Sequence, residues 1–163
     1  MQTLRDPVCG KTLEPPATAF TAKHREAQYH FCSALCRDRF LEIPTLYTLA
    51  RADLLEAPRL RQHRLKPTAA SRSALAAAQE KLTGAWGIHQ VNIDGTSLLV
   101  EYDTLRISLA LIEAELAAAG LDLKGGWHNL QRGYWKFTER NELDNLILSG
   151  KGACCSRPPP RLR

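Results

Sequence analysis

The sequence predicts an α+β protein that consists of a small treble-clef-like metal-binding domain and a ferredoxin-like βαββαβ domain with a C-terminal helical extension. Three observations lead to this prediction. Cys9, Cys32 and Cys36 have the spacing C-x22-C-x3-C, and three thiols from a turn and a helix start suit a small metal site. From residue 59 onward, the hydrophobic pattern indicates strand, helix, hairpin, helix and strand in that order. A further helical pattern begins at residue 127.

The chain of 163 residues has room for two small domains, and 44% of its residues are hydrophobic. A domain of about 50 residues has only a small core, which a bound metal ion would stabilise. We expect five segments: a metal-binding domain at 1–50, a helical linker at 51–58, the ferredoxin-like domain at 59–124, a C-terminal helix at 125–148 and a flexible tail at 149–163.

The cysteine count and the charge narrow the class of protein. Five cysteines, an odd number, favour metal ligation over a disulfide framework. The formal net charge is +5, but the arginines are scattered, so nucleic acid is not the expected partner. The N-terminus lacks the apolar run of a signal peptide, and no apolar stretch is long enough to span a membrane. We therefore expect a cytoplasmic protein whose thiols stay reduced.

Both arms of the cysteine site have local signals in the sequence. Residues 8–11 are expected to form a tight turn, in which Gly10 takes a positive φ and lets backbone amides face a sulfur. Residues 28–32 are expected to form a strand, and Ser33 is expected to cap a helix over 34–42. Cys36 then lies in the first helical turn, where the positive helix end is expected to lower the pKa of its thiol.

The second domain has a regular order of elements. The predicted elements are a strand at 60–66, a helix at 71–82, strands at 88–94 and 97–102, a helix at 105–119 and a strand at 121–123. Asp94-Gly95 predicts a type I′ hairpin turn, and Gly120 is expected to end the second helix. Between the two domains, another helical stretch is expected at 45–58.

The C-terminal helix is expected to extend from residue 127 to about residue 148. Leu130, Tyr134 and Phe137 recur on one side of it, and this side is expected to pack onto the second domain. The tail that follows is rich in glycine and proline, so it is not expected to be ordered alone.

A tetrahedral zinc site would need a fourth ligand besides the three cysteines. Asp6 precedes Cys9 by three residues, which is the place of the first ligand in a C-x2-C knuckle. Asp6 is therefore either a carboxylate ligand or only a cap of the turn. His30 is the second candidate, because in a strand it would share a face with Cys32. The alternative for His30 is an ordinary surface or core histidine.

Two stretches of the first domain share a pattern with a known family. They are Asp6-Pro7-Val8-Cys9-Gly10 and Tyr29-His30-Phe31-Cys32-Ser33, followed by Cys36, Phe40, Pro44 and Tyr47. The pattern covers residues 4–47 and resembles the YHS domain of the wider TRASH group. The resemblance implies a treble-clef-like metal site on Cys9, Cys32 and Cys36. It also implies a role in heavy-metal transport or resistance, often beside copper-transporting P-type ATPases.

The second domain resembles another family through residues 82–93, Leu-Thr-Gly-Ala-Trp-Gly-Ile-His-Gln-Val-Asn-Ile, and 100–103, Val-Glu-Tyr-Asp. These stretches are similar to the heavy-metal-associated (HMA) domain of copper chaperones and ATPase N-termini. The C-x-x-C of that family is missing, because the loop at 66–71 contains no thiol. The domain is therefore expected to be a scaffold, a docking surface for another HMA domain, or a dimerisation unit that gives a homodimer.

Cys154 and Cys155 lie in the tail. Adjacent cysteines rarely pair with each other, so they stay available as a dithiol that soft ions such as Cu(I) would bind. The alternative is two tail thiols without a metal role. We include both residues among the candidate metal ligands.

The residues and the resemblances together predict a heavy-metal-binding protein for copper or another thiophilic metal. It would bind Cu(I) or Zn(II) and act in buffering, delivery or resistance by thiolate exchange, with a metal-transporting P-type ATPase or another HMA domain as candidate partner. The alternative is a zinc-stabilised interaction or regulatory module that contacts nucleic acid or a protein. An enzyme is not expected, because no orienting third group accompanies Cys36 and His30.

Overall fold

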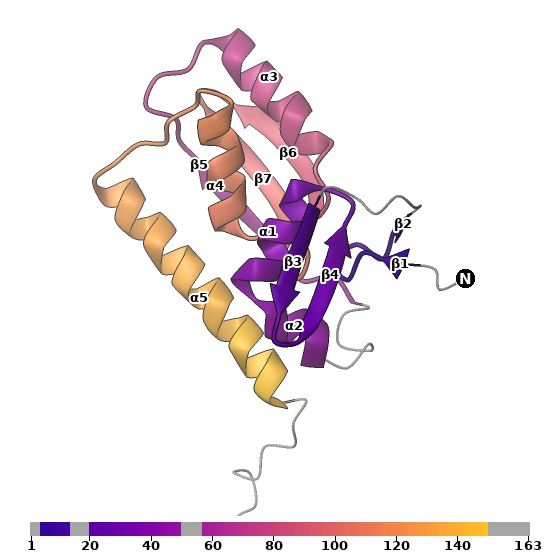
Figure 1. Ribbon diagram of the computed structural model, residues 1–163. Coiled ribbons are helices and arrows are strands. Elements are labelled where there is room, and N and C mark those ends of the chain that lie inside the picture. Colours follow the sequence, from indigo (N-terminus) through magenta and orange to yellow (C-terminus); the bar gives the residue numbers. More distant parts are fainter. Residues whose placement is uncertain (1–3, 14–19, 50–56, 150–163) are drawn as a thin grey trace, which may run out of the picture.

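The computed structural model describes residues 4–13, 20–49 and 57–149, and the structural statements below refer to them. Figure 1 shows two short two-stranded sheets and two helices near the N-terminus, beside a three-stranded sheet with its own helices. The chain is thus a mixed α and β protein, as predicted. Within the described ranges, no helix combines the length and the apolar character that crossing a bilayer requires.

The N-terminal part contains two antiparallel strand pairs and two helices. Its elements are β1 (Leu4–Arg5), β2 (Thr12–Leu13), β3 (Phe20–His24), β4 (Ala27–Phe31), α1 (Ala34–Glu42) and α2 (Pro44–Leu49). The predicted start of α1 is confirmed, since the Ser33 hydroxyl accepts a hydrogen bond from the Cys36 N–H at 3.3 Å. Pro44 opens α2, which reaches Leu49. Of the helical stretch expected at 45–58, residues 50–56 lie outside the described residues, and residues 57 and 58 are not helical.

The second part is built on one antiparallel sheet with the strand order β5-β7-β6. Its elements are β5 (Leu60–Leu65), α3 (Arg72–Thr83), β6 (Ile88–Asp94), β7 (Ser97–Asp103), α4 (Leu109–Ala118) and α5 (Trp127–Ser149). One core joins the sheet to α3 and α4, and its buried residues include Leu65, Leu75, Leu82, Val100, Ile112 and Leu116. The apolar side chains that the helical and strand periodicity places on one face of each element thus pack together in this core.

The hairpin between β6 and β7 is present, but its turn type differs from the prediction. Asp94 pairs with Ser97, so the loop consists of Gly95 and Thr96. Of these two residues only Gly95 has a positive φ, at +60°, which is typical of a type II′ turn. A type I′ turn needs positive φ at both positions, and the β-branched side chain of Thr96 disfavours that conformation.

α4 begins at Leu109, four residues after the predicted start. The Ser108 hydroxyl caps it by accepting a hydrogen bond from the Leu111 N–H at 3.1 Å. The preceding turn is held by Asp103, whose carboxylate accepts a hydrogen bond from the Leu105 N–H at 3.0 Å. The segment 105–108 is therefore a turn in front of the helix instead of its first turn.

The last strand expected in the second domain is reduced to one bridge. Pro67 and Leu123 form an isolated antiparallel bridge, and the described residues around 121–123 form no longer ladder. Proline has no N–H to donate, which limits the pairing at this edge. The end of α4 agrees with the prediction, since Gly120 follows it with a φ of +77°.

α5 has the predicted position, but a different face is buried. Leu130, Tyr134 and Phe137 are 66%, 66% and 62% exposed, so the prediction that they pack onto the second domain is wrong. Arg132 is buried because it pairs with Glu113, at 3.2 Å. Polar and aliphatic residues share the buried face of α5: His128, Arg132, Glu139, Leu143, Leu146 and Ile147.

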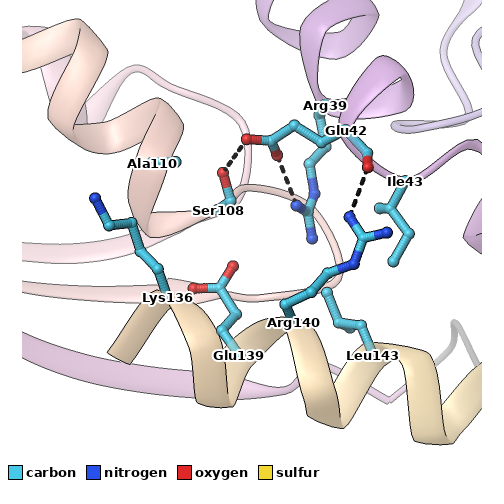
Figure 2. Close-up of a pocket in the computed structure, with 9 residues that line it drawn as sticks. All are labelled: Arg39, Glu42, Ile43, Ser108, Ala110, Lys136, Glu139, Arg140 and Leu143. Atoms are coloured by element: carbon cyan, nitrogen blue, oxygen red, sulfur yellow. Dashed lines mark hydrogen bonds and ion pairs between the residues drawn. The ribbon is translucent and has the colours of Figure 1, made fainter. Parts of the chain in front are cut away.

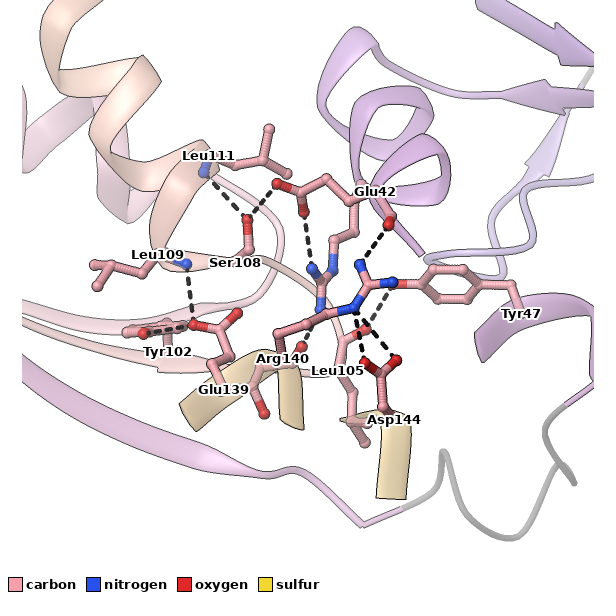
Figure 3. A network of polar contacts seen from close by, with 12 residues as sticks. Glu42, Tyr47, Tyr102, Leu105, Ser108, Leu109, Leu111, Glu139, Arg140 and Asp144 are labelled. Atoms are coloured by element: carbon pink, nitrogen blue, oxygen red, sulfur yellow. Dashed lines mark hydrogen bonds and ion pairs between the residues drawn. The ribbon is translucent and has the colours of Figure 1, made fainter. Parts of the chain in front are cut away.

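Hydrogen bonds fix α1 and α2 to the second part of the chain, as Figure 3 shows. The Tyr47 hydroxyl donates to the Leu105 carbonyl at 2.7 Å, and the Ser108 hydroxyl donates to the Glu42 carboxylate at 2.8 Å. Arg140 of α5 donates to the Glu42 carbonyl at 2.7 Å. An apolar cluster reinforces these contacts, with Ile43, Leu46, Leu105, Leu143, Leu146 and Ile147 as its buried members.

Candidate metal centre

Three thiols and one carboxylate converge where the β1–β2 loop meets the end of β4 and the start of α1. The Sγ atoms of Cys9 and Cys32 are 3.5 Å apart, and those of Cys32 and Cys36 are 3.7 Å apart. Ligand atoms of Asp6, Cys9, Cys32 and Cys36 all lie within 4.8 Å of one another. Three sulfurs at about 2.3 Å from one ion would be about 3.8–4.0 Å apart, so the donor set fits a thiophilic metal after a slight expansion.

The loop between β1 and β2 positions Cys9. The Asp6 N–H donates to the Lys11 carbonyl at 2.9 Å, and the Gly10 N–H donates to the Asp6 carbonyl at 2.8 Å. Gly10 has a φ of +75°, as predicted for this turn. The turn lets the Lys11 N–H donate a hydrogen bond to the Cys9 sulfur.

Asp6 links the two arms of the site. Its buried carboxylate accepts hydrogen bonds from the N–H groups of Val8 at 2.8 Å and Cys9 at 3.3 Å through Oδ1. Through Oδ2 it accepts a hydrogen bond from the Cys32 N–H at 2.8 Å. Burial alone would raise the pKa of Asp6, but these bonds outweigh it and hold the pKa below its ordinary value. Because backbone amides engage both oxygens, the geometry favours the capping role of Asp6.

The pKa values of two thiols in the cluster, Cys9 and Cys36, are raised above their ordinary value. Burial raises the pKa of Cys9 to about 11 and also raises the pKa of Cys36, and the Asp6 carboxylate adds to both shifts. Hydrogen bonds from the Lys11 N–H and the Ser33 hydroxyl oppose these shifts only in part. The expected lowering of the Cys36 pKa by the helix end is therefore wrong, because burial outweighs the helix dipole. Protons must leave these thiols when a metal binds.

An aromatic core lies beneath the cysteine cluster. Phe31, Cys36 and Phe40 are buried together. The ring centroid of Phe40 lies 5.2 Å from that of Phe31, 4.7 Å from that of Tyr29 and 6.1 Å from that of Tyr47. This packing holds α1 against the β3–β4 sheet and keeps Cys36 away from solvent.

His30 is not among the residues of the cluster. β4 ends at Phe31, and Cys32 belongs to the bend that leads into α1. The strand alternation that would place His30 and Cys32 on one face therefore no longer applies. Cys154 and Cys155 lie outside the described residues, so their metal role stays a prediction.

A surface hollow of about 230 Å³ borders Cys9. Leu105 and Arg106, from the turn before α4, line it together with Tyr47 and the residues around Cys9. The second part of the chain thus contributes to the surroundings of this thiol. Leu105 and Arg106 were not predicted from the sequence, because no local pattern indicates that two segments so far apart in the chain meet.

A second cavity, of about 180 Å³, lies between α1, α4 and α5 (Figure 2). No cysteine lines it. The Glu42 carboxylate there accepts hydrogen bonds from Arg39 and from Ser108, both at 2.8 Å. Burial raises the pKa of Glu139 to about 7, although the nearby Arg39 lowers it in part. Because its charged groups pair with one another, we assign no metal to this cavity.

One segment of the chain is similar in sequence to a copper transporter. No protein-family model matches the sequence. A stretch of 48 residues is 42% identical to a copper-transporting P-type ATPase of Rhizobium leguminosarum bv. viciae, covering 29% of this chain and 6% of that protein. The chain thus matches only a small fraction of the length of this relative.

Two solved structures resemble parts of the fold. A putative copper-ion-binding protein from Bacillus anthracis str. Ames has a TM-score of 0.39 and 18% identity, over 42% of this chain and 100% of that chain. A copper form of a CopA variant from Bacillus subtilis has a TM-score of 0.37 and 14% identity, over 40% of this chain and 91% of that chain. In sequence, the chain is similar to a copper-transporting P-type ATPase over one short segment.

Proposed function

We propose that this chain binds Cu(I) through the thiolates of Cys9, Cys32 and Cys36 and passes it on by thiolate exchange. The observation that carries the proposal is the convergence of the three sulfurs, with separations of 3.5 Å and 3.7 Å along the cluster. Thiolates are soft ligands that suit Cu(I). The segment that is 42% identical to a copper-transporting P-type ATPase supports copper over other thiophilic metals.

We infer that the N-terminal part is a YHS/TRASH-type domain with a treble-clef-like site and that residues 59–124 form an HMA-like, ferredoxin-like domain. The strand order β5-β7-β6, with the Pro67–Leu123 bridge next to β5, supports a split βαβ sandwich whose fourth strand is short. The sequence has no cysteine between residues 37 and 153. We therefore propose that the HMA-like domain acts as a scaffold or docking surface and not as a second metal site.

The exposure of the three thiols suggests where exchange begins. Cys36 is 2% exposed, whereas Cys9 is half-buried and borders the 230 Å³ hollow. An incoming thiolate would bond to Cu(I) while the bond between Cu(I) and the Cys9 sulfur breaks. The released Cys9 thiolate would then take up a proton, because burial raises its pKa to about 11. No electron is transferred, so the process is ligand exchange and not enzymatic catalysis.

The candidate partner is a cytoplasmic metal-binding domain with exposed thiolates, such as that of a metal-transporting P-type ATPase or another HMA domain. Arg106 lines the hollow beside Cys9. Its guanidinium is paired with the Asp103 carboxylate at 2.9 Å, so Arg106 bounds the hollow without offering a free positive charge. Buffering, delivery and resistance to copper all use this exchange, and they differ in which partner receives the metal.

Native mass spectrometry of the full chain, purified without oxygen and titrated with Cu(I) or Zn(II), tests the proposal. We expect more than one Cu(I) per chain in the wild type, and loss of the tightest equivalent in Cys32→Ser. The double variant with Cys154→Ser and Cys155→Ser serves as the matched control, because it should lose only the second equivalent. A single tight zinc ion without any Cu(I) response would contradict the proposal and favour a zinc-stabilised interaction module.

A further inference from the structure

A stripe of exposed apolar side chains runs along the outer side of α5. Its members Trp127, Leu130, Tyr134 and Phe137 are 82%, 66%, 66% and 62% exposed. Their spacing of three, four and three residues places them on one face of the helix. Figure 1 shows α5 at the edge of the molecule, with α4 and α2 beside its inner side. We call these four residues the α5 stripe.

The area of the α5 stripe is sufficient for an interface. A whole aromatic side chain contributes about 150–250 Å², so the exposed fractions correspond to roughly 500–600 Å² for the four residues. Two such stripes facing each other would bury on the order of 1,100 Å², near the lower end of stable protein interfaces. The largest apolar patch on a typical monomer is about 300–600 Å² and is often functional, so the α5 stripe lies at the upper end of this range.

Gly133 lies next to the stripe, in the interior of the 23-residue helix α5. A Cβ atom built on it would meet nothing within 4 Å, so the described fold of one chain does not require glycine there. Glycine inside a helix costs about 0.5–1 kcal/mol relative to alanine. The close approach of the backbone of another helix would explain why glycine stands at position 133, beside the exposed aromatic residues.

The charges around the stripe are compatible with self-association. Gln131 and Thr138, which flank the stripe, are uncharged. Arg132 and Lys136 point to the inner side of α5 and pair with Glu113, at 3.2 Å and 2.9 Å. This matters because two copies with a formal net charge of +5 would otherwise repel each other. At the stripe, a second copy can therefore approach α5 without repulsion between like charges.

We propose that the α5 stripe pairs with the same stripe of a second copy of this chain, with the two helices antiparallel. In this register Trp127 faces Phe137 of the second copy, and Leu130 faces Tyr134. Gly133 then lies beside the two-fold axis, where the helices are closest. A parallel pairing would instead bring Asn141 and then Asp144, the next two positions of the same spacing, opposite their own copies.

Analytical ultracentrifugation of the full chain, over micromolar to submillimolar concentrations, tests this pairing. We expect a dimer with a dissociation constant in the micromolar range, with or without Cu(I). Leu130→Glu is expected to weaken association at least about 100-fold, because it buries an unpaired charge. Leu41→Glu is the matched control, since Leu41 is another exposed leucine, on α1 and 51% exposed, and should leave the dimer intact. Circular dichroism checks that both variants fold.

The orientation of the helices has its own test. Tyr134→Lys alone should also dissociate the dimer. Mixing the Leu130→Glu and Tyr134→Lys chains in equal amounts should restore association, because in the antiparallel pair the carboxylate of one chain faces the ammonium of the other. A wild type that stays monomeric, equal effects of Leu41→Glu and Leu130→Glu, or a mixture as monomeric as the single variants would overturn the proposal.

Discussion

The Asp6 carboxylate accepts a hydrogen bond from the Cys32 backbone N–H at 2.8 Å, although 26 residues separate the two in the sequence. The same carboxylate accepts hydrogen bonds from Val8 and Cys9. One buried anion therefore holds both arms of the candidate metal centre together without a bound ion. A site arranged in this way loses little conformational entropy when it takes up its ligand.

Asp6→Asn is expected to destabilise the metal-free protein by about 1–3 kcal/mol, because an amide group cannot accept all three backbone hydrogen bonds. Urea unfolding of the metal-free chain measures this. Asp38→Asn is the matched control, since the Asp38 side chain is 41% exposed and pairs with its neighbour Arg37 at 2.7 Å, and it should change stability by less than about 0.5 kcal/mol. Unchanged metal-free stability together with lost Cu(I) affinity would make Asp6 a ligand instead.

Phe40→Ala is expected to destabilise the protein by about 3–5 kcal/mol, because Phe40 is fully buried among four aromatic rings. Its neighbour Leu41 is 51% exposed, so Leu41→Ala should cost less than about 1 kcal/mol. Urea unfolding followed by circular dichroism compares the two variants. Similar losses for both would mean that α1 is not packed through Phe40.

Ser71 and Ser108 both cap helices, at 3.1 Å from the N–H groups of Ala74 and Leu111. Ser71→Ala is expected to cost about 1 kcal/mol, the usual value for a lost cap. Ser108→Ala should cost roughly 1.5–3 kcal/mol more, because the Ser108 hydroxyl also donates to the charged Glu42 carboxylate. Thermal or urea unfolding gives both values. Equal losses would show that the contact between α1 and the turn before α4 contributes little.

Glu139 makes the stability of the fold depend on pH. Burial raises its pKa from 4.5 to about 7, and Tyr102 and Leu109 donate hydrogen bonds to it at 3.2 Å. The folded state thus binds this proton more tightly than the unfolded state does. The contribution of Glu139 to the free energy of unfolding should therefore fall as pH rises from about 4.5 to about 7, by on the order of 3 kcal/mol, and then stay constant.

Glu139→Gln removes this titration while its amide oxygen still accepts a hydrogen bond. Compared with the wild type, the variant should lose the decrease in stability between pH 5 and pH 7 that the folded pKa of about 7 causes. Urea unfolding at several pH values in this interval measures the difference. Parallel curves for the two proteins would show that another group is responsible.

Elements with a complete local signal were predictable from the sequence. The Ser33 cap, the glycine after α4 and the alternation in β6 and β7 depend on neighbours within a few residues, and each occurs where expected. The convergence of Cys9, Cys32 and Cys36 was also expected from their spacing. It combines two local structures, a turn and a capped helix start, which the sequence indicates separately.

The errors arise where a long-range contact decides the outcome. The prediction of which face of α5 is buried was wrong. Arg132 pairs with Glu113, and Glu139 accepts a hydrogen bond from Tyr102, so these polar side chains of α5 can be buried. The aromatic residues on the other side then remained exposed. The predicted direction of the Cys36 pKa shift was wrong for a similar reason. The helix end is a local feature of the sequence, but the burial of the thiol depends on the whole cluster.

α1 is only nine residues long, with Cys36 near its beginning and Glu42 at its end. A helix of this length moves as one rigid unit. A displacement of the Cys36 sulfur therefore also shifts Glu42 and its hydrogen bonds with Ser108 and Arg140. Capture of an ion at the cysteines should therefore change how fast the amide protons of α5 exchange with solvent, although α5 contributes no ligand.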